Sequence, residues 1–379
     1  MKLSHHNHLM YCLNIHPGDL WEDNLAAISH YALQVKSLIS PHDSFALGLR
    51  LSAQAAHELL PQVDYFADFL RNHNLYVVTI NGISYGLFQG RLIKENIFLP
   101  DWSSYERVQF TINLAKILVR LLPDGESGTI CTVPCHYGKK EKYGVISNLQ
   151  AFALFLEDIK KKTGKHISLA LEPEPDCYLD TLDSTLNFFD KLYHMSDESV
   201  RQHIGICLDT CHATVEFGSP LSWLRELNRF GIQVPKIQIS AALCARSKSP
   251  EESRHYFIPF NEIRYLHQTR VHENGGVLRY RDLIDAILDA PFGEWRVHYH
   301  VPLTWLGNDM FSSAMTIENE FFTEALNQGG KQFEVETYKY NVIPGPKRPI
   351  INSIVSELEW VIKKFGYPFQ PILSPEAAR

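Results

Sequence analysis

The chain has 379 residues, of which 45% are hydrophobic, and a formal net charge of −7. This length and composition allow a large buried core, and α/β barrels of this size commonly form one domain. Sequence-independent binding of nucleic acid requires a basic surface, so the acidic balance argues against a nucleic-acid partner. No apolar run reaches the roughly 18 residues that span a bilayer, so we expect no transmembrane segment. Residues 1–8 are polar and lack an apolar signal-peptide core, so we expect no secretory signal.

Nine short runs rich in β-branched and aromatic residues alternate with amphipathic stretches, a pattern typical of parallel βα units. Helical spacing of apolar residues is clear over 52–74, 105–125, 147–165, 182–195 and 220–231. The third of these stretches ends in a basic turn followed by Gly164, a good helix C-terminus. The predicted strands are, in chain order, 8–14, 45–51, 76–83, 128–134, 166–172, 204–209, 236–240, 296–301 and 333–338.

Eight βα units close a barrel, so one of the nine predicted strands must lie outside it. Runs such as ISLALE and IGICLD are apolar on both faces, as expected of parallel strands covered by helices. We predict a single-domain (β/α)8 TIM barrel over residues 1–379, with an extra strand or insertion near 290–303 and a tail over 366–379. The irregular stretches 84–102, 134–145 and 245–266 are expected to be loops over a site.

The seven cysteines are scattered and odd in number, and they show neither CxxC nor zinc-finger spacing. Most of them lie inside apolar runs. We therefore expect reduced thiols that pack in the core, and a cytoplasmic location.

Polar side chains follow nearly every predicted strand. Because the carboxyl ends of the strands in a parallel barrel converge on one mouth, these side chains are expected to meet there. Acids need a partner at such positions, since burial of an unpaired carboxylate costs free energy. Carboxylate oxygens together with imidazoles are ligands that suit Mn²⁺, Mg²⁺ or Zn²⁺. The side chains are Asn14, His16, Arg50, Asn81, His136, Glu172, Glu174, Asp209, His212, Gln238, His298, His300, Glu334 and Glu336.

The segments ALEPEP, GICLDTCH, KIQIS and EVETY, in this order, resemble the xylose isomerase-like barrel superfamily of sugar isomerases, epimerases, hydroxypyruvate isomerase and metal-dependent abasic-site endonucleases. The resemblance implies a divalent-metal site with Glu172, Asp209, Gln238 and Glu336 as ligands. It also implies that His212 joins a metal cluster or contacts substrate. Gln238 follows the hydroxypyruvate isomerase pattern, and its amide oxygen favours Mg²⁺ or Mn²⁺ over Zn²⁺.

Longer segments, among them HLMYCLNIHPGDLW, TINGISYG, CLDTCHATVEF and RVHYHVPL, resemble the metabolite traffic protein EboE family over nearly the whole chain. This resemblance implies that the protein acts on or carries a small secondary-metabolite precursor. It also implies other proteins of the Ebo cluster as partners. It implies no particular reaction, so whether the protein is an enzyme stays open at this point.

The run RVHYH supplies His298 and His300, whose side chains share one face of an extended strand. We predict both as further metal ligands, either for a second metal or in place of the histidine absent from the seventh strand. With a metal-bound hydroxy-carbonyl substrate, Glu172 and Glu336 would be the acid–base pair. His212 is a third predicted catalytic residue. The predicted substrate contacts are Arg50, Asn81, His16 and Glu174.

Simpler interpretations compete for some of these residues. Asp209 after a strand is also expected to cap the next helix, and Arg50 at a strand end commonly pairs with a carboxylate. His298 and His300 would equally suit a polar barrel interior. The run KKEKYG over 139–144 is most simply a solvated loop, and alternatively it attracts an anionic group.

Three alternative functions also follow from the sequence. The first is a metal-dependent sugar or hydroxy-acid isomerase or epimerase. The second is an abasic-site endonuclease-like phosphodiesterase, and the third is a non-catalytic metabolite-binding protein.

Overall fold

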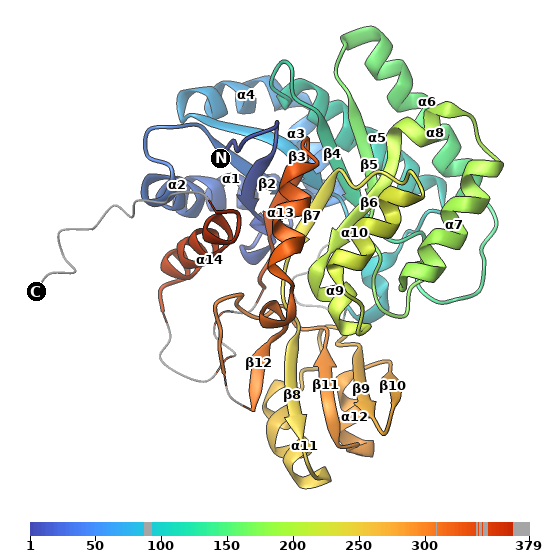
Figure 1. Cartoon of the computed structure of the whole chain (residues 1–379). Helices are drawn as coiled ribbons and strands as arrows, with labels where there is room; N and C mark the ends of the chain where they lie inside the picture. Colours follow the sequence, from blue (N-terminus) through green and yellow to red (C-terminus); the bar gives the residue numbers. More distant parts are fainter. Residues whose placement is uncertain (87–92, 308, 339, 341–342, 344–347, 367–379) are drawn as a thin grey trace, which may run out of the picture.

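The computed structural model describes residues 1–379 except 87–92, 308, 339, 341–342, 344–347 and 367–379, so most of the predicted tail lies outside the described residues. Eight parallel strands form a nearly closed barrel (Figure 1). In order around the barrel they are β1 (His8–Tyr11), β2 (Phe45–Arg50), β3 (Leu75–Asn81), β4 (Gly128–Thr132), β5 (Ile167–Leu171), β6 (Ile204–Asp209), β7 (Lys236–Ile239) and β13 (Gln332–Val335).

Closure between β1 and β2 depends on a close backbone approach. A parallel bridge joins Cys12 to Gly48, beside the last residues of β1. A Cβ atom at Gly48 would lie 2.6 Å from the carbonyl oxygen of Tyr11, and closer still to the carboxylate of Glu334. Only a glycine therefore lets the first two strands approach here.

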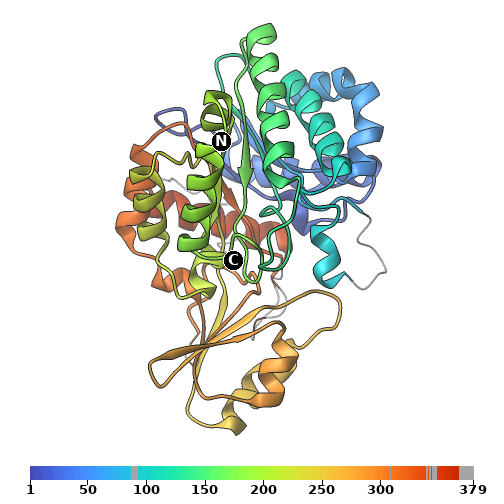
Figure 2. The same cartoon turned by 90° about the vertical axis from the view of Figure 1, so that its right-hand side faces the viewer.

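Helices connect the strands and cover the outside of the barrel, as the amphipathic stretches predict (Figures 1 and 2). Gly164 ends α6 with a φ of 74°, which confirms the predicted helix end. Short 3-10 turns occupy Leu13–Ile15, Leu60–Gln62, Lys94–Phe98, Ile258–Phe260 and Ser313–Thr316, and a π-helical segment, Ile28–Ala32, joins α1 to α2. The helices of the barrel are α1 (Trp21–Ala27), α2 (Leu33–Ile39), α3 (Ala53–Leu59), α4 (Val63–Asn72), α5 (Tyr105–Leu121), α6 (Val145–Thr163), α7 (Leu182–His194), α8 (Glu198–His203), α9 (Thr210–Val215), α10 (Pro220–Arg229), α13 (Asn319–Asn327) and α14 (Ile350–Lys364).

An antiparallel five-stranded sheet is inserted between β7 and β13 and lies beyond the carboxyl ends of the barrel strands (Figures 1 and 2). Its strand order is β10-β9-β11-β8-β12. The predicted strand 296–301 lies outside the barrel and overlaps β11 at residues 296–297, so the insertion expected near 290–303 is present but much larger. The stretch 245–266, expected to be a loop, contains most of β8 and all of α11. The elements of the insertion are β8 (Leu243–Ser247), α11 (Pro250–Phe257), β9 (Thr269–Glu273), β10 (Gly276–Tyr280), α12 (Leu283–Asp289), β11 (Gly293–Val297) and β12 (Met310–Ser312).

Arginines of the insertion fix it to loops of the barrel. The guanidinium of Arg270 is fully buried and donates to Asp176 Oδ1 at 2.6 Å and to Glu216 Oε1 at 2.8 Å. Arg296 donates to the carbonyl oxygen of Thr214 at 2.7 Å. The sheet is thereby held against the loop after β5 and the end of α9. The single domain over 1–379 stays a prediction.

All seven cysteines are buried and unpaired, as the prediction of core packing requires. Within the described ranges, no helix combines the length and the apolar character needed to cross a bilayer.

Candidate metal centre at the barrel mouth

Three carboxylates meet where β5, β6 and β13 end. Glu172, Asp209 and Glu336, hereafter the acid group, each contribute an oxygen within 4.8 Å of the others, and each residue is at most 3% exposed. Among the described residues, the only basic side chains within 4.0 Å of these carboxylates are His212 and His300. Burial, and then nearby negative groups, raise the pKa of Glu172 and of Glu336 well above the usual range. Such a cluster requires protons or a cation to neutralise it.

The two oxygens of Asp209 have different surroundings. Oδ1 accepts from the backbone N–H of His212 at 2.9 Å and from the hydroxyl of Ser240 at 2.6 Å, so it caps α9. Oδ2 is buried and has no hydrogen-bond partner in the described part of the chain. The competing interpretations of Asp209 are therefore compatible, because one oxygen caps the helix and the other is available to a cation.

Gln238 lies within the same cluster, in β7. Its side-chain NH₂ donates to Glu336, and its Oε1 accepts from the thiol of Cys207 at 2.9 Å. Its amide oxygen would reach a cation among the acids only after the amide rotates. A further amide, Asn14 Nδ2, donates to Glu336 Oε1 at 2.5 Å.

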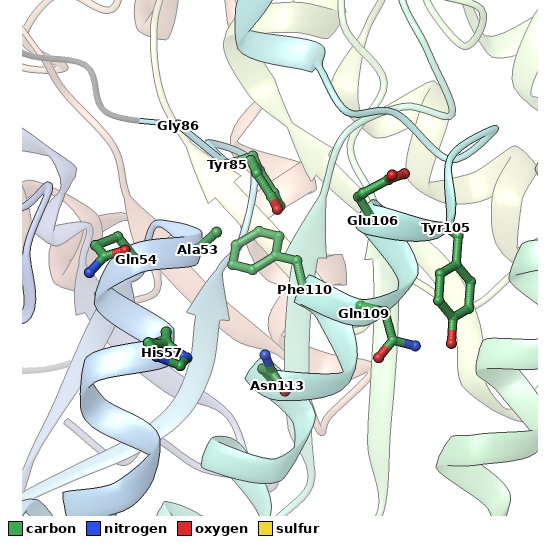
Figure 3. A pocket seen from close by; sticks show the side chains of 10 residues that line it. All are labelled: Ala53, Gln54, His57, Tyr85, Gly86, Tyr105, Glu106, Gln109, Phe110 and Asn113. Carbon is green, nitrogen blue, oxygen red and sulfur yellow. The ribbon is translucent and has the colours of Figure 1, made fainter.

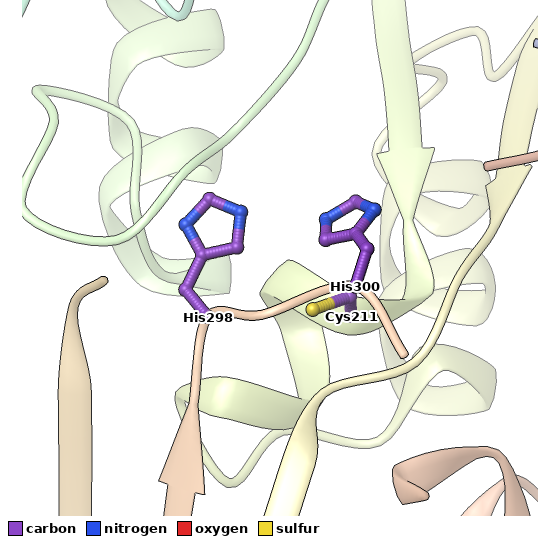
Figure 4. Close-up of side chains that lie close together, drawn as sticks. All are labelled: Cys211, His298 and His300. Atoms are coloured by element: carbon purple, nitrogen blue, oxygen red, sulfur yellow. The ribbon is translucent and has the colours of Figure 1, made fainter. Parts of the chain in front are cut away.

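Three imidazoles adjoin the acids: His212, His298 and His300, hereafter the histidine group. Figure 4 shows the side chains of His298 and His300 on the same side of the segment that follows β11. Each Nδ1 faces an oxygen that can only accept, so each Nδ1 carries the proton and each Nε2 keeps a lone pair. The acceptors are, in the same order, the Pro173 carbonyl oxygen at 2.8 Å, Gln268 Oε1 at 2.7 Å and the Glu336 carbonyl oxygen at 3.0 Å.

The Nε2 lone pairs of His212 and His298 face each other and repel unless a proton or a cation lies between them. Nε2 of His212 lies 3.1 Å from Nε2 of His298, and Nε2 of His300 is buried without a hydrogen-bond partner among the described residues. Burial lowers the pKa of His298 well below its usual value and that of His300 to about 4, which disfavours a proton at neutral pH. The ligating nitrogens of two imidazoles on one tetrahedral ion lie about 3.3 Å apart, close to the distance observed here. Metal-bound histidines also commonly donate their other N–H to a carbonyl oxygen, as these histidines donate Nδ1–H.

The two groups are contiguous. Oxygen or nitrogen atoms of Asp209, His212 and His300 lie within 4.8 Å of one another, as do those of Glu174, His212 and His298. Glu174 Oε1 lies 3.6 Å from His298 Nδ1, and burial raises the pKa of Glu174 to about 7. The residues present therefore fit a divalent cation, and the histidine group offers further ligand atoms beside it.

Two of the predicted substrate contacts lie apart from these groups. Arg50 approaches Asp19 at 3.6 Å and donates to the hydroxyl of Ser84 at 3.2 Å, which matches its interpretation as a structural ion pair. The ring of His16 stacks on Tyr31 with 4.2 Å between centroids. Their contact with a substrate stays a prediction.

Asn81 belongs to a polar layer inside the barrel. Its Oδ1 accepts from Lys236 Nζ at 2.6 Å, and its Nδ2 donates to Glu334 Oε2 at 2.9 Å. Lys236 and Glu334 form a fully buried ion pair at 2.5 Å. The amide of Asn81 is thus already hydrogen-bonded to this pair.

The basic run 139–144 is largely paired with acids of the barrel. Lys139 forms an ion pair with Asp180, and Lys142 contacts Asp101 Oδ2 at 2.5 Å. These two ammonium groups are neutralised, so the solvated-loop interpretation is favoured over an anion site.

A separate cavity of about 480 Å³ lies between α3 and α5 (Figure 3). It shares no residue with either group. A small hollow beside Asp209 and His212 is lined in part by Trp223.

The sequence prediction missed three kinds of supporting residue. Gln268 fixes the tautomer of His298, Ser240 holds Asp209, and the thiols of Cys131 and Cys207 contact Glu172 and Gln238. Ser240 and the two cysteines lie on predicted strands beside predicted ligands, and this position could have indicated that they contact those ligands. No sequence pattern indicated a role for Gln268, because it precedes β9, a strand of the insertion that the sequence did not predict.

Comparisons with known proteins bear on the fold. No protein-family model matches the chain, and neither does any curated protein sequence. Among solved structures, the chain is similar to the IolI protein with a bound zinc atom, with 13% identity and a TM-score of 0.50 over 96% of this chain and 100% of that one. It is also similar to a xylose isomerase-like TIM barrel protein from Mycobacterium smegmatis in complex with magnesium, with 12% identity and a TM-score of 0.49 over 94% and 98%. The likeness to the IolI structure and the eight parallel strands show a TIM-barrel fold, which confirms the predicted (β/α)8 barrel.

Proposed function

We propose that the protein is a divalent-metal-dependent enzyme of the isomerase or epimerase type, which acts on a small hydroxy-carbonyl compound. The observation that carries the proposal is the acid group, three buried carboxylates with no lysine or arginine within 4.0 Å among the described residues. The unpartnered Oδ2 of Asp209 and Nε2 of His300 support the same conclusion. The proposed ligands are Glu172, Asp209, Glu336, His298 and His300, while Gln238, also predicted as a ligand, donates to Glu336 and would join them only after its amide rotates.

The acids suit proton transfer between neighbouring carbons of such a substrate. A bound divalent cation would polarise the carbonyl group and stabilise the negative charge that develops on the substrate oxygens. Glu172 and Glu336 come from strands on either side of β6 and β7, and burial keeps their pKa values high enough for them to accept and return a proton. His212, whose Nδ1–H is held by Pro173, directs Nε2 toward the same space and orients the substrate.

The finer part of the proposal concerns the substrate. The resemblance to the EboE family supports a secondary-metabolite precursor, handled in the cytoplasm together with other Ebo proteins. This part rests on the sequence segments alone.

A phosphodiesterase is the second candidate, and the histidine group favours it. Three Nε2 lone pairs beside three acids offer more than one cation position, as two-metal phosphoester hydrolysis requires.

Metal analysis followed by isotope exchange tests both candidates. We expect the purified protein to retain Mn²⁺ or Zn²⁺ after dialysis, and to incorporate deuterium from D₂O into small hydroxy-ketones. Glu336→Gln should abolish the exchange. Absence of bound metal would overturn the proposal, and bound metal with hydrolysis of bis(p-nitrophenyl) phosphate but no exchange would establish the second candidate instead.

A further inference from the structure

Two thiols lie directly beside the acid group inside the barrel. Cys131 belongs to β4 and Cys207 to β6, and both are fully buried. They pack together with Ala170 of β5 and with Ile83. The small side chain of Ala170 on the strand between them lets both sulfurs reach the same part of the interior.

Each thiol contacts a predicted metal ligand. Cys131 Sγ lies 2.7 Å from Glu172 Oε2, and Cys207 Sγ lies 2.9 Å from Gln238 Oε1. A carboxylate oxygen and an amide oxygen accept here, so in both contacts the S–H group is the donor. Of the described side chains, Cys131 is the only one that donates a hydrogen bond to Glu172.

Cys207 affects a second acid, Glu336, through the side chain of Gln238. Because Oε1 of Gln238 faces the thiol, its NH₂ group faces Glu336 and donates to it. Cys131 thus engages Oε2 of Glu172 and leaves Oε1 to face a cation. Gln238, held by Cys207, donates to Oε2 of Glu336 and, together with Asn14 at Oε1, fixes the orientation of that carboxylate.

We propose that Cys131 and Cys207 are positioning residues that orient Glu172 and, through Gln238, Glu336 for metal binding. The inference rests on the proposed metal centre and assigns these thiols a role beyond core packing. Hydrogen bonds from surrounding residues hold ligands in place at most metal sites, and their loss typically lowers metal affinity about 10- to 100-fold.

A second arrangement is possible for the same atoms. Ligand atoms of Cys131, Glu172 and Cys207 lie within 4.8 Å of one another, close enough to hold a soft cation directly. Both sulfurs donate a proton to an oxygen, Cys131 to Glu172 and Cys207 to Gln238, whereas direct ligation would require the thiolate form. The positioning role is therefore favoured, and thiolate ligation becomes an outcome of the test.

Titration of the full-length protein with Mn²⁺ tests the inference. We expect Cys131→Ala and Cys207→Ala to weaken Mn²⁺ binding about 10-fold or more, whereas Cys131→Ser and Cys207→Ser, which keep a donor, stay within about 3-fold of the wild type. Cys244→Ala, which removes an equally buried thiol in the insertion, is the matched control and should leave affinity unchanged. Cys131→Val, which lacks a donor but fills the space, replaces the alanine variant where that variant does not fold.

The outcomes separate this inference from the proposed function. Absence of Mn²⁺ binding by the wild type would overturn the metal centre and the inference with it. Binding by the wild type with unchanged affinity in the alanine and valine variants would overturn the positioning role alone. A sulfur-to-cobalt charge-transfer band on Co²⁺ loading would show thiolate ligands and would also overturn it.

Discussion

The acid group and the histidine group meet at the same mouth, but they reach it by different routes. The acids stand at the carboxyl ends of β5, β6 and β13, positions that converge in any parallel barrel. His298 and His300 follow β11, a strand of the antiparallel insertion, and His298 is oriented by Gln268 from the same insertion. The barrel alone therefore positions the acids, whereas two of the three histidines depend on the docking of the insertion. The two groups should be separable by mutation.

The largest effect is expected from Arg270→Met. This change leaves Asp176 and Glu216 without a buried guanidinium, and breaking such a buried pair costs about 3–5 kcal/mol of the free energy of unfolding. Hydrogen exchange should rise in the insertion and at residues 298–300 while the barrel strands stay protected. Arg246→Met, which removes an exposed arginine paired with Glu294, is the control. An unchanged free energy of unfolding in Arg270→Met, or hydrogen exchange that rises equally in the barrel strands, would contradict the view that the insertion and the barrel position the two groups separately.

Asp209→Asn should abolish most of the metal affinity without unfolding the protein. The asparagine keeps an oxygen to cap α9 but removes the negative charge. Since changes that only surround a metal site cost about 10- to 100-fold, loss of a ligand should cost about 100-fold or more in Mn²⁺ affinity, measured by calorimetry. Glu320→Gln, on the exposed face of α13, should bind as the wild type does. An Mn²⁺ affinity in Asp209→Asn equal to that of the wild type would show that Asp209 is not a metal ligand.

His298→Ala should have a smaller effect on affinity, confined to the histidine group. We expect Zn²⁺ binding to weaken about 10-fold, or the metal content to fall by one ion, with Mn²⁺ binding at the acids retained. His255→Ala, an exposed histidine of the insertion, serves as the control. Equal losses of Zn²⁺ and Mn²⁺ would mean that the two groups form one indivisible site.

The stabilisation by metal should increase with pH. Burial raises the pKa of Glu172 and Glu336 well above the usual 4.5, so protons compete with metal on these acids at pH values above 4.5. His300, whose pKa is lowered to about 4, competes little.

The acids set the sign of this dependence. The metal-free folded state binds protons that the unfolded chain has already released, so these acids lower its stability as pH rises above about 4.5. The melting temperatures of metal-free and metal-loaded protein should therefore diverge as the pH rises above about 4.5, and a constant difference would contradict this account.

Sequence patterns predict the barrel better than the insertion, for a physical reason. The apolar run ISLAL of β5 is buried on both faces and is recognisable without knowledge of its neighbours. The insertion strands TRVHE and GVLRY are partly exposed and charged, so they resemble loops until their antiparallel partners are known.

The same contrast holds for the site. Glu172 and Asp209 are predictable because strand ends converge, and His298 and His300 are recognisable as a paired motif. Gln268 reaches His298 only through the non-local pairing of the insertion, which no local pattern encodes.

Anomalous diffraction from crystals soaked in Mn²⁺ tests the central claim most directly. The account predicts a strong peak between the carboxylates of Glu172, Asp209 and Glu336, and a second peak near His212 and His298 after soaking in Zn²⁺. A map with no peak between the three carboxylates, from protein that diffracts well and retains its fold, would contradict it.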